Sequence, residues 1–170
     1  MGVQPGRSRW LCGFVLSVIV MVVGAAPVAA QADHATRATF VIPPVTGNGN
    51  PIAATAMNYL GAPYVWGGTT AAGFDCSGFV YGVVNEVTGG GFPRSMESQV
   101  ASGRAVAPQN LQPGDLVFFQ NTYKAGLSHA GIYVGNGQFA NAANAGTGVT
   151  LSPLWDSYWG SRFLAARRIN

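Results

Sequence analysis

The order of the periodic segments constrains the fold of this 170-residue chain more than any other feature. Before Pro113-Gly114, apolar residues recur at helical spacing. After it, short segments rich in Val, Ile, Phe and Tyr alternate with turn residues, which is typical of strands. Helices first and strands second predict an α+β domain, with N-terminal helices packed on a mostly antiparallel β-sheet.

Two helices are expected from clear start and stop signals. Pro51 to Leu60 has apolar residues at helical spacing, proline in its first turn and Gly61 just beyond its end. Asp75 suits the N-cap of a second helix, which the run Gly89-Gly90-Gly91 ends. Cys76 then lies in the first turn of this second helix.

Weaker patterns complete the domain. A short third helix is expected at about 95–102, and residues 62–73, rich in Gly, Pro and aromatic residues, are expected to form a shaped loop. Five strands are expected, at 115–120, 129–134, 138–143, 149–152 and 163–169.

The N-terminal segment fits an export signal. Arg7 and Arg9 give it a positive start, and residues 10–31 carry no charge. Ala30-Gln31-Ala32 matches the A-x-A cleavage pattern, with Val28-Ala29-Ala30 as a second option. We expect a secreted protein of the cell envelope that touches the membrane only transiently through this segment. An uncleaved anchor is the alternative, because the uncharged run is about long enough to span a bilayer.

Three segments follow from these patterns. Residues 1–32 are the expected signal peptide. Residues 33–50 contain Pro43-Pro44 and a Gly-Asn run without sustained periodicity, so we expect a flexible linker. Residues 51–170 have about the length of a single domain and are expected to form the catalytic domain.

The charged and metal-binding residues exclude two classes of partner. Without Arg7 and Arg9, seven of the nine basic residues face six acidic ones, a net charge of about +1. Nothing in this balance indicates nucleic acid. The expected domain also has one cysteine and one histidine, which cannot supply the three or four ligands of a typical zinc site, so we expect no metal.

Cys76 is the residue that most constrains the chemistry. Cys12 lies in the expected signal peptide, so Cys76 is the one thiol of the expected mature chain and cannot form an internal disulfide. The first turn of a helix stabilises a thiolate. His34 falls in the linker, which leaves His129 as the candidate base of a Cys-His pair. The alternative is a buried cysteine that packs as a small apolar side chain.

Hairpin geometry selects the residue that holds the imidazole. If Gly135-Asn136-Gly137 is a three-residue loop, Val134 pairs with Gln138, and Asn141 lies diagonal to His129 on the same face. A two-residue Asn-Gly turn would put Asn141 on the other face. A triad of the Cys-His-Asn type therefore requires an odd loop or a bulge at this turn. Ordinary hydrogen bonding by the histidine and turn chemistry by the asparagine are the alternatives.

Four spaced motifs resemble those of the NlpC/P60 family of cell-wall cysteine peptidases. Pro93-Arg94 matches as well, between the second motif and the third. The four are Gly61-Ala62-Pro63-Tyr64-Val65-Trp66-Gly67-Gly68, Phe74-Asp75-Cys76-Ser77-Gly78-Phe79-Val80, Leu111-Gln112-Pro113-Gly114-Asp115-Leu116-Val117-Phe118-Phe119 and Ser128-His129-Ala130-Gly131-Ile132-Tyr133-Val134-Gly135.

The resemblance implies a papain-like α+β fold and a bacterial thiol protease. Such a hydrolase cuts amide bonds in peptidoglycan stem peptides, commonly the γ-D-glutamyl to diamino-acid linkage, through a thioester and without a cofactor. Cys76 matches the family's nucleophile and His129 its base. Asn141 departs from the commoner pattern, because many members have histidine there, but an asparagine carbonyl can also orient the ring.

The resemblance also implies three substrate-binding residues. Tyr64 matches a tyrosine near the nucleophile, where its hydroxyl steadies the oxyanion or the substrate. Asp75 and Ser77 match positions that help some members to bind the free amino end of the stem peptide. Aromatic packing for Tyr64 and helix capping for Asp75 are equally open.

Two other functions stay open at this point. One is a non-catalytic relative that binds muropeptides or the cell wall without cutting them. The other is a related Cys-His amidase or acyltransferase on a different substrate. Fast reaction of Cys76 with iodoacetamide near neutral pH would favour an enzyme over a binding protein.

Overall fold

The computed structural model describes residues 49–170. The expected signal peptide and all but the last two residues of the expected linker lie outside this range. Within it, no helix has the length and apolar character needed to cross a membrane. In chain order the elements are α1 (Pro51–Asn58), β1 (Thr69–Thr70), β2 (Gly73–Phe74), α2 (Cys76–Thr88), α3 (Met96–Ala101), β3 (Arg104–Val106), the 3₁₀ turn η1 (Pro108–Asn110), β4 (Leu116–Gln120), β5 (Leu127–Gly135), β6 (Gln138–Asn144), β7 (Gly148–Pro153), the 3₁₀ turn η2 (Gly160–Arg162) and β8 (Phe163–Arg168).

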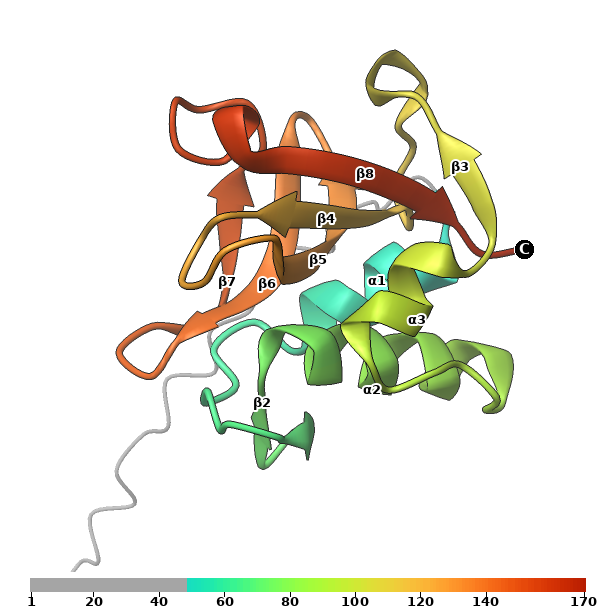
Figure 1. Cartoon of the computed structure of the whole chain (residues 1–170). Coiled ribbons are helices and arrows are strands. Elements are labelled where there is room, and N and C mark those ends of the chain that lie inside the picture. Colours follow the sequence, from blue (N-terminus) through green and yellow to red (C-terminus); the bar gives the residue numbers. More distant parts are fainter. Residues whose placement is uncertain (1–48) are drawn as a thin grey trace, which may run out of the picture. The chain divides into compact units, whose positions relative to one another are not determined.

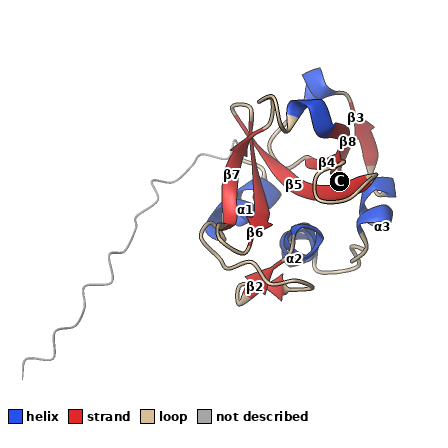
Figure 2. Ribbon diagram, turned by 60° about the vertical axis from the view of Figure 1, so that its left-hand side comes forward, coloured by secondary structure: helices blue, strands red, loops and turns tan. Residues whose placement is uncertain are grey.

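Six strands form one antiparallel sheet in the order β3-β8-β4-β5-β6-β7. The three helices lie together on one side of it (Figure 1). Figure 2 shows α2 beneath the sheet, where it packs against β5 and β6. The expected α+β architecture is therefore confirmed.

Three short strands were not anticipated. β3 pairs with β8 at one edge of the sheet, and β1 pairs with β2 inside the expected loop at 62–73. Each has only two or three residues, which is too short for an alternating pattern to show in the sequence.

Helix α2 begins and ends at the expected signals. The Asp75 carboxylate accepts a hydrogen bond from the Gly78 backbone N–H at 2.6 Å, and Gly89 adopts the left-handed conformation with φ of 80°. Gly78 has no room for a side chain, because a Cβ there would collide with the Gly68 carbonyl. The loop before α2 can thus lie directly against the first turn of the helix.

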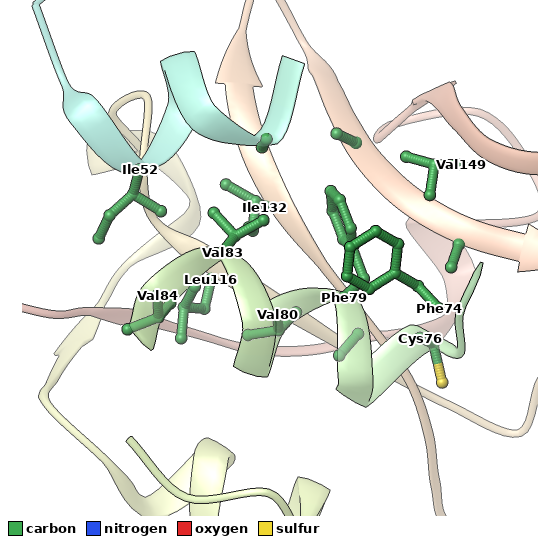
Figure 3. Packing of buried hydrophobic residues seen from close by; sticks show 14 of the residues in the cluster. Ile52, Phe74, Cys76, Phe79, Val80, Val83, Val84, Leu116, Ile132 and Val149 are labelled. Atoms are coloured by element: carbon green, nitrogen blue, oxygen red, sulfur yellow. The ribbon is translucent and has the colours of Figure 1, made fainter. Parts of the chain in front are cut away.

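The main core lies between the helices and the sheet. Apolar side chains of α2 pack there against residues of β4 and β5, and Cys76 lies at the margin of this cluster (Figure 3). Its largest fully buried members are Phe74, Phe79, Phe118, Leu116 and Ile132. This packing anchors the start of α2, and therefore the thiol, against the sheet.

The turn between β5 and β6 differs from the expected one. Gly135 pairs with Gln138, so the turn has two residues, Asn136 and Gly137. Both have positive φ, 52° and 70°, as the favoured type I′ hairpin turn requires. The predicted three-residue loop, with Val134 opposite Gln138, is wrong.

A bulge next to this turn places His129 and Asn141 on the same face of the sheet, as predicted. The register shifts between Tyr133 and Gly135, which leaves Val134 as the extra residue. Beyond it Tyr133 pairs with Phe139, as the longer loop would have required. Because strand side chains alternate between faces, this shift is what places Asn141 on the same face as His129.

Candidate active site

Asp75 joins three segments around the thiol. One carboxylate oxygen accepts from the backbone of Gly78 at 2.6 Å and from the Ser77 hydroxyl at 3.2 Å. The other accepts from the backbone of Gly67 at 2.8 Å and from the Arg94 guanidinium at 2.7 Å. Arg94 also donates to the Ser77 hydroxyl at 2.6 Å. Asp75 therefore caps α2, and the four hydrogen bonds that its carboxylate accepts fix the segments around Cys76.

Gln99 connects the start of α2 to the segment that carries Arg94. Its side chain is fully buried, and its Nε2 donates to the carbonyls of Ser77 and Pro93, both at 3.0 Å. The segment that carries Arg94 is therefore fixed to the start of α2. Sequence reasoning matched Arg94 to a family motif without giving it a role, and it missed Gln99, because nothing in a linear pattern shows which carbonyls a distant amide will reach.

The Cys76 thiol is buried at the start of α2. Burial and, next, the negative charge of Asp75 raise its pKa to about 11, although the backbone N–H groups of Ser77, Ala130 and Cys76 itself act in the opposite direction. We expected the helix start to stabilise a thiolate. In the free protein its effect is outweighed by desolvation, so the resting residue is a neutral thiol.

His129 and Asn141 are in direct contact. The His129 Nε2 lies 2.9 Å from the Asn141 Oδ1. The asparagine amide is oriented by its Nδ2, which donates to the Thr150 carbonyl at 3.3 Å and to the Ser152 hydroxyl at 3.0 Å. Since the Oδ1 can only accept, the neutral imidazole must carry its proton on Nε2. Its Nδ1 is then the basic nitrogen, as the predicted role of Asn141 requires.

An aromatic wall encloses the imidazole. The Trp159 ring lies 4.9 Å from the His129 ring at 33°, and Phe119 lies 6.1 Å away on the same side of the sheet. Burial lowers the pKa of His129 to about 4, despite the opposing effect of the hydrogen bond that its Nε2–H donates to Asn141. The histidine is therefore neutral at physiological pH, with its Nδ1 unprotonated.

Two cavities meet at Tyr123. One, of about 180 Å³, is lined by Cys76, and the other, of about 300 Å³, by His129. Tyr123 lines both, from the loop between β4 and β5. The backbone of Ala130, next to His129, reaches the Cys76 sulfur. The fold thus brings the start of α2 and the start of β5 together, as the proposed Cys-His pair needs.

Tyr64 is placed near the thiol, as expected from the resemblance. Burial and then the charges of Cys76 and Asp75 raise its pKa, and Tyr123 is affected in the same way. Both hydroxyls are therefore protonated donors at neutral pH. The sequence analysis did not single out Tyr123, because it belongs to none of the motifs and lies in an exposed loop.

Metal ligands do not gather in this part of the chain. Within residues 49–170, no group of three or more His, Cys, Asp or Glu side chains could hold a metal ion.

Comparison with known protein families assigns the chain. The model of the NlpC/P60 family matches residues 61–168, well over half of the sequence. The chain belongs to the NlpC/P60 family. All six candidate residues lie inside the matched NlpC/P60 segment, together with Arg94 and Gln99.

NlpC/P60 relatives are similar over the same region. A γ-DL-glutamyl hydrolase of Bacillus subtilis (strain 168) is 50% identical over 121 residues, 71% of this chain and 29% of the relative. The probable peptidoglycan endopeptidase LytE of the same organism is 44% identical, over 71% of this chain and 34% of LytE. The chain thus spans about a third of the length of these two relatives.

A solved NlpC/P60 structure shows the same fold. The domain of the peptidoglycan hydrolase SagA is 32% identical with a TM-score of 0.61, and the match covers 72% of this chain and 98% of that domain.

The raised thiol pKa has a measurable consequence for alkylation of Cys76. At pH 7 a thiol with a pKa of about 11 is ionised about a hundredfold less than an ordinary thiol. We expect iodoacetamide to label Cys76 at least tenfold more slowly than free cysteine, with a rate that rises about tenfold per pH unit from 7 to 10. Peptide mass spectrometry measures this rate, and a rate that levels off below pH 8 would contradict the raised pKa. Slow labelling at neutral pH does not, therefore, favour a binding protein over an enzyme.

Proposed function

We propose that this protein is a cysteine peptidase that hydrolyses amide bonds in peptidoglycan stem peptides, at the γ-D-glutamyl to diamino-acid linkage. The observation that carries the proposal is the bonded pair of His129 and Asn141, together with Cys76, the one thiol among residues 49–170, which lies at the start of α2 and is reached by the backbone of Ala130. The names of the matched relatives support it, since one is a γ-DL-glutamyl hydrolase and another a probable peptidoglycan endopeptidase.

In the proposed mechanism His129 acts as a general base. Its Nδ1 takes the proton of the Cys76 thiol as the sulfur attacks the scissile carbonyl, because the resting pair is neutral thiol and neutral imidazole. The C–N bond then breaks, and the leaving amine takes the proton from the Nδ1. Water then attacks the thioester carbonyl and gives a proton to the His129 Nδ1, the C–S bond breaks to release the acid, and the Nδ1 returns the proton to the sulfur, which regenerates the thiol.

Hydrogen-bond donors around the sulfur stabilise the charge that develops. Backbone N–H groups at the start of α2 are the candidate oxyanion donors, and the Tyr64 hydroxyl, whose raised pKa reflects in part the charge of Cys76, is a further protonated donor. Ser77 and Asp75 are held by Arg94, so they position this end of the substrate site. Asn141 keeps the imidazole in the tautomer that the base needs.

The proposed place of action is outside the cytoplasm. Peptidoglycan is extracytoplasmic, and the uncharged segment after Arg9, with its A-x-A pattern, fits an export signal. Peptidoglycan stem peptides are then the partner, with no cofactor, metal or nucleic acid in the proposed reaction.

A second substrate is favoured by one observation. The relative that is 50% identical is named for γ-DL-glutamyl bonds and not for the cell wall. The same site could then hydrolyse γ-glutamyl amides outside peptidoglycan, through the same thioester.

Defined substrates test the proposed function. The purified protein is incubated with a stem tripeptide, L-Ala-γ-D-Glu-diaminopimelate, and with an oligomer of γ-linked glutamate, and the products are identified by mass spectrometry. Release of the free diamino acid from the tripeptide is expected. Cleavage of the oligomer alone would move the substrate outside the wall. Binding of the tripeptide without cleavage of either would indicate a non-catalytic relative.

A further inference from the structure

We propose that a cavity at the β3 edge of the sheet binds a phosphate ester of a sugar or polyol, with Arg104 and Arg168 holding the phosphate. The cavity has a volume of about 370 Å³ and is lined by β3, η1, the residues that follow η1 and the last residue of β8. This volume is typical of small-molecule sites. The proposal is independent of the proposed function, because the cavity shares no lining residue with those at Cys76 and His129.

Arg104 and Arg168 lie directly opposite each other on paired strands, and both line the cavity. β3 is the edge strand of the sheet, at the opposite edge from β7 (Figure 1). Directly opposed residues project to the same face with Cβ atoms about 5 Å apart, and two like charges so placed destabilise the strand pair. An anion bound between the two guanidinium groups would remove this repulsion.

Asp115 neutralises only one of these two charges. The Arg168 Nε and Nη2 donate to its carboxylate, and the Nη2 also donates to the Asn110 carbonyl at 3.1 Å. Among residues 49–170, the Arg168 Nη1 bonds no protein atom, and neither does any side-chain nitrogen of the exposed Arg104. The cavity therefore has one uncompensated guanidinium and, beside it, a second one with a free nitrogen.

The donors in this cavity favour a phosphate over a carboxylate. No acidic side chain of the described residues lines it, and Arg168 already binds one carboxylate, that of Asp115. A phosphate monoester has three strong acceptor oxygens, which is enough to bond both guanidinium groups at once.

The neutral lining residues favour a ligand with hydroxyl groups. Gln109, Asn110 and Gln112 line the cavity, and their side-chain amides bond no other residue in the range 49–170. An amide can both donate to a hydroxyl group and accept from it. No aromatic side chain in the described part of the chain lines the cavity, so a nucleobase would find no ring to stack on. A phosphorylated sugar or polyol therefore fits better than a nucleotide.

A nuclear magnetic resonance titration of the isotope-labelled full chain tests this site without depending on turnover. The ligands are glycerol 3-phosphate, inorganic phosphate, acetate and adenosine monophosphate, at constant ionic strength and above the second phosphate pKa of about 6. The arginine Nε–H and the glutamine side-chain resonances report contact with the cavity. Arg104→Met and Arg104→Lys are the test variants. Lys124→Met is the charge-matched control, because Lys124 is exposed, has no ion-pair partner among the described residues and does not line this cavity.

Glycerol 3-phosphate is expected to shift the Arg104 Nε–H and the side-chain amides of Gln109 and Gln112, and to bind more tightly than the other three ligands. Arg104→Met should weaken its binding about tenfold. Arg104→Lys should weaken it about threefold, because an ammonium keeps the charge but lacks the planar fork of donors. Lys124→Met should change it less than twofold. Without ligand, Arg104→Met should unfold at the parent's temperature or above it, since the repulsion from Arg168 is gone.

Four results would overturn the proposal. They are no shift of the cavity resonances with glycerol 3-phosphate at millimolar concentration, binding of acetate as tight as that of the ester, tighter binding of adenosine monophosphate, and an equal loss in Lys124→Met and Arg104→Met. Vesicles of phosphatidylglycerol and phosphatidylcholine distinguish the source of the phosphate. Binding to these vesicles without binding of the soluble ester would assign the two arginines to a membrane surface and also contradict the proposed ligand.

Discussion

Replacing His129 with glutamine is expected to lower kcat for stem-peptide hydrolysis by about 10³-fold or more, because His129 is the proposed base that takes the thiol proton. The imidazole is buried, bonded to Asn141 and enclosed by Trp159, so its position is fixed before substrate arrives. Glutamine keeps a polar side chain at this site but cannot accept and return a proton. Initial rates of product formation measure the loss.

Alkylation of the same variant separates two versions of this mechanism. With His129 neutral and Cys76 protonated at rest, the alkylation rate of Cys76 at pH 7 should be nearly the same in the wild type and in His129→Gln. A resting thiolate-imidazolium pair would instead make alkylation at least tenfold slower in the variant. That slowing, or full activity of His129→Gln, would contradict the assigned general base.

Replacing Asp115 with alanine is expected to lower the free energy of unfolding by about 3 kcal/mol, the low end of the range for breaking a buried ion pair. Asp115 is fully buried, and both of its oxygens bond the Arg168 guanidinium, one at 2.7 Å. Its carboxylate also accepts from the Gln112 backbone at 2.8 Å. The low end applies because the Arg168 side chain is 18% exposed and keeps some contact with water.

Urea unfolding of the variant and of a surface control measures this effect. Asp156→Ala is the control, because Asp156 is exposed and bonds only the backbone of Trp159, at 2.6 Å. We expect a loss of about 1 kcal/mol or less for the control. An Asp115→Ala protein as stable as the control would show that this pair does not hold β4 and β8 together.

Local signals predicted much of this fold. The start of α2 at Asp75 and its end at Gly89 could be read from the sequence because a cap and a left-handed glycine act within one turn. The contact between His129 and Asn141 was also predicted, since strand alternation and one turn decide which face each side chain takes. The predicted length of the turn was wrong, because a two-residue turn with a bulge and a three-residue loop place Asn141 on the same face of the sheet.

Features that depend on distant neighbours were not predictable in this way. The helix start favours a thiolate at Cys76, but burial by residues far along the chain raises its pKa. The partners of Asp75 depend on where the segment that carries Arg94 lies against the start of α2. The same holds for Tyr123, whose position comes from the loop between β4 and β5.

The most direct test of the central claim compares the wild type with Cys76→Ala on the stem tripeptide, with products read by mass spectrometry. The account predicts release of the diamino acid by the wild type and a rate at least about 10³-fold lower for the variant, because the thioester cannot form. Circular dichroism should show the same fold, since alanine fills most of the space of the small Cys76 side chain. A folded Cys76→Ala protein that still cleaves the tripeptide at the wild-type rate would contradict the assignment of Cys76 as the nucleophile.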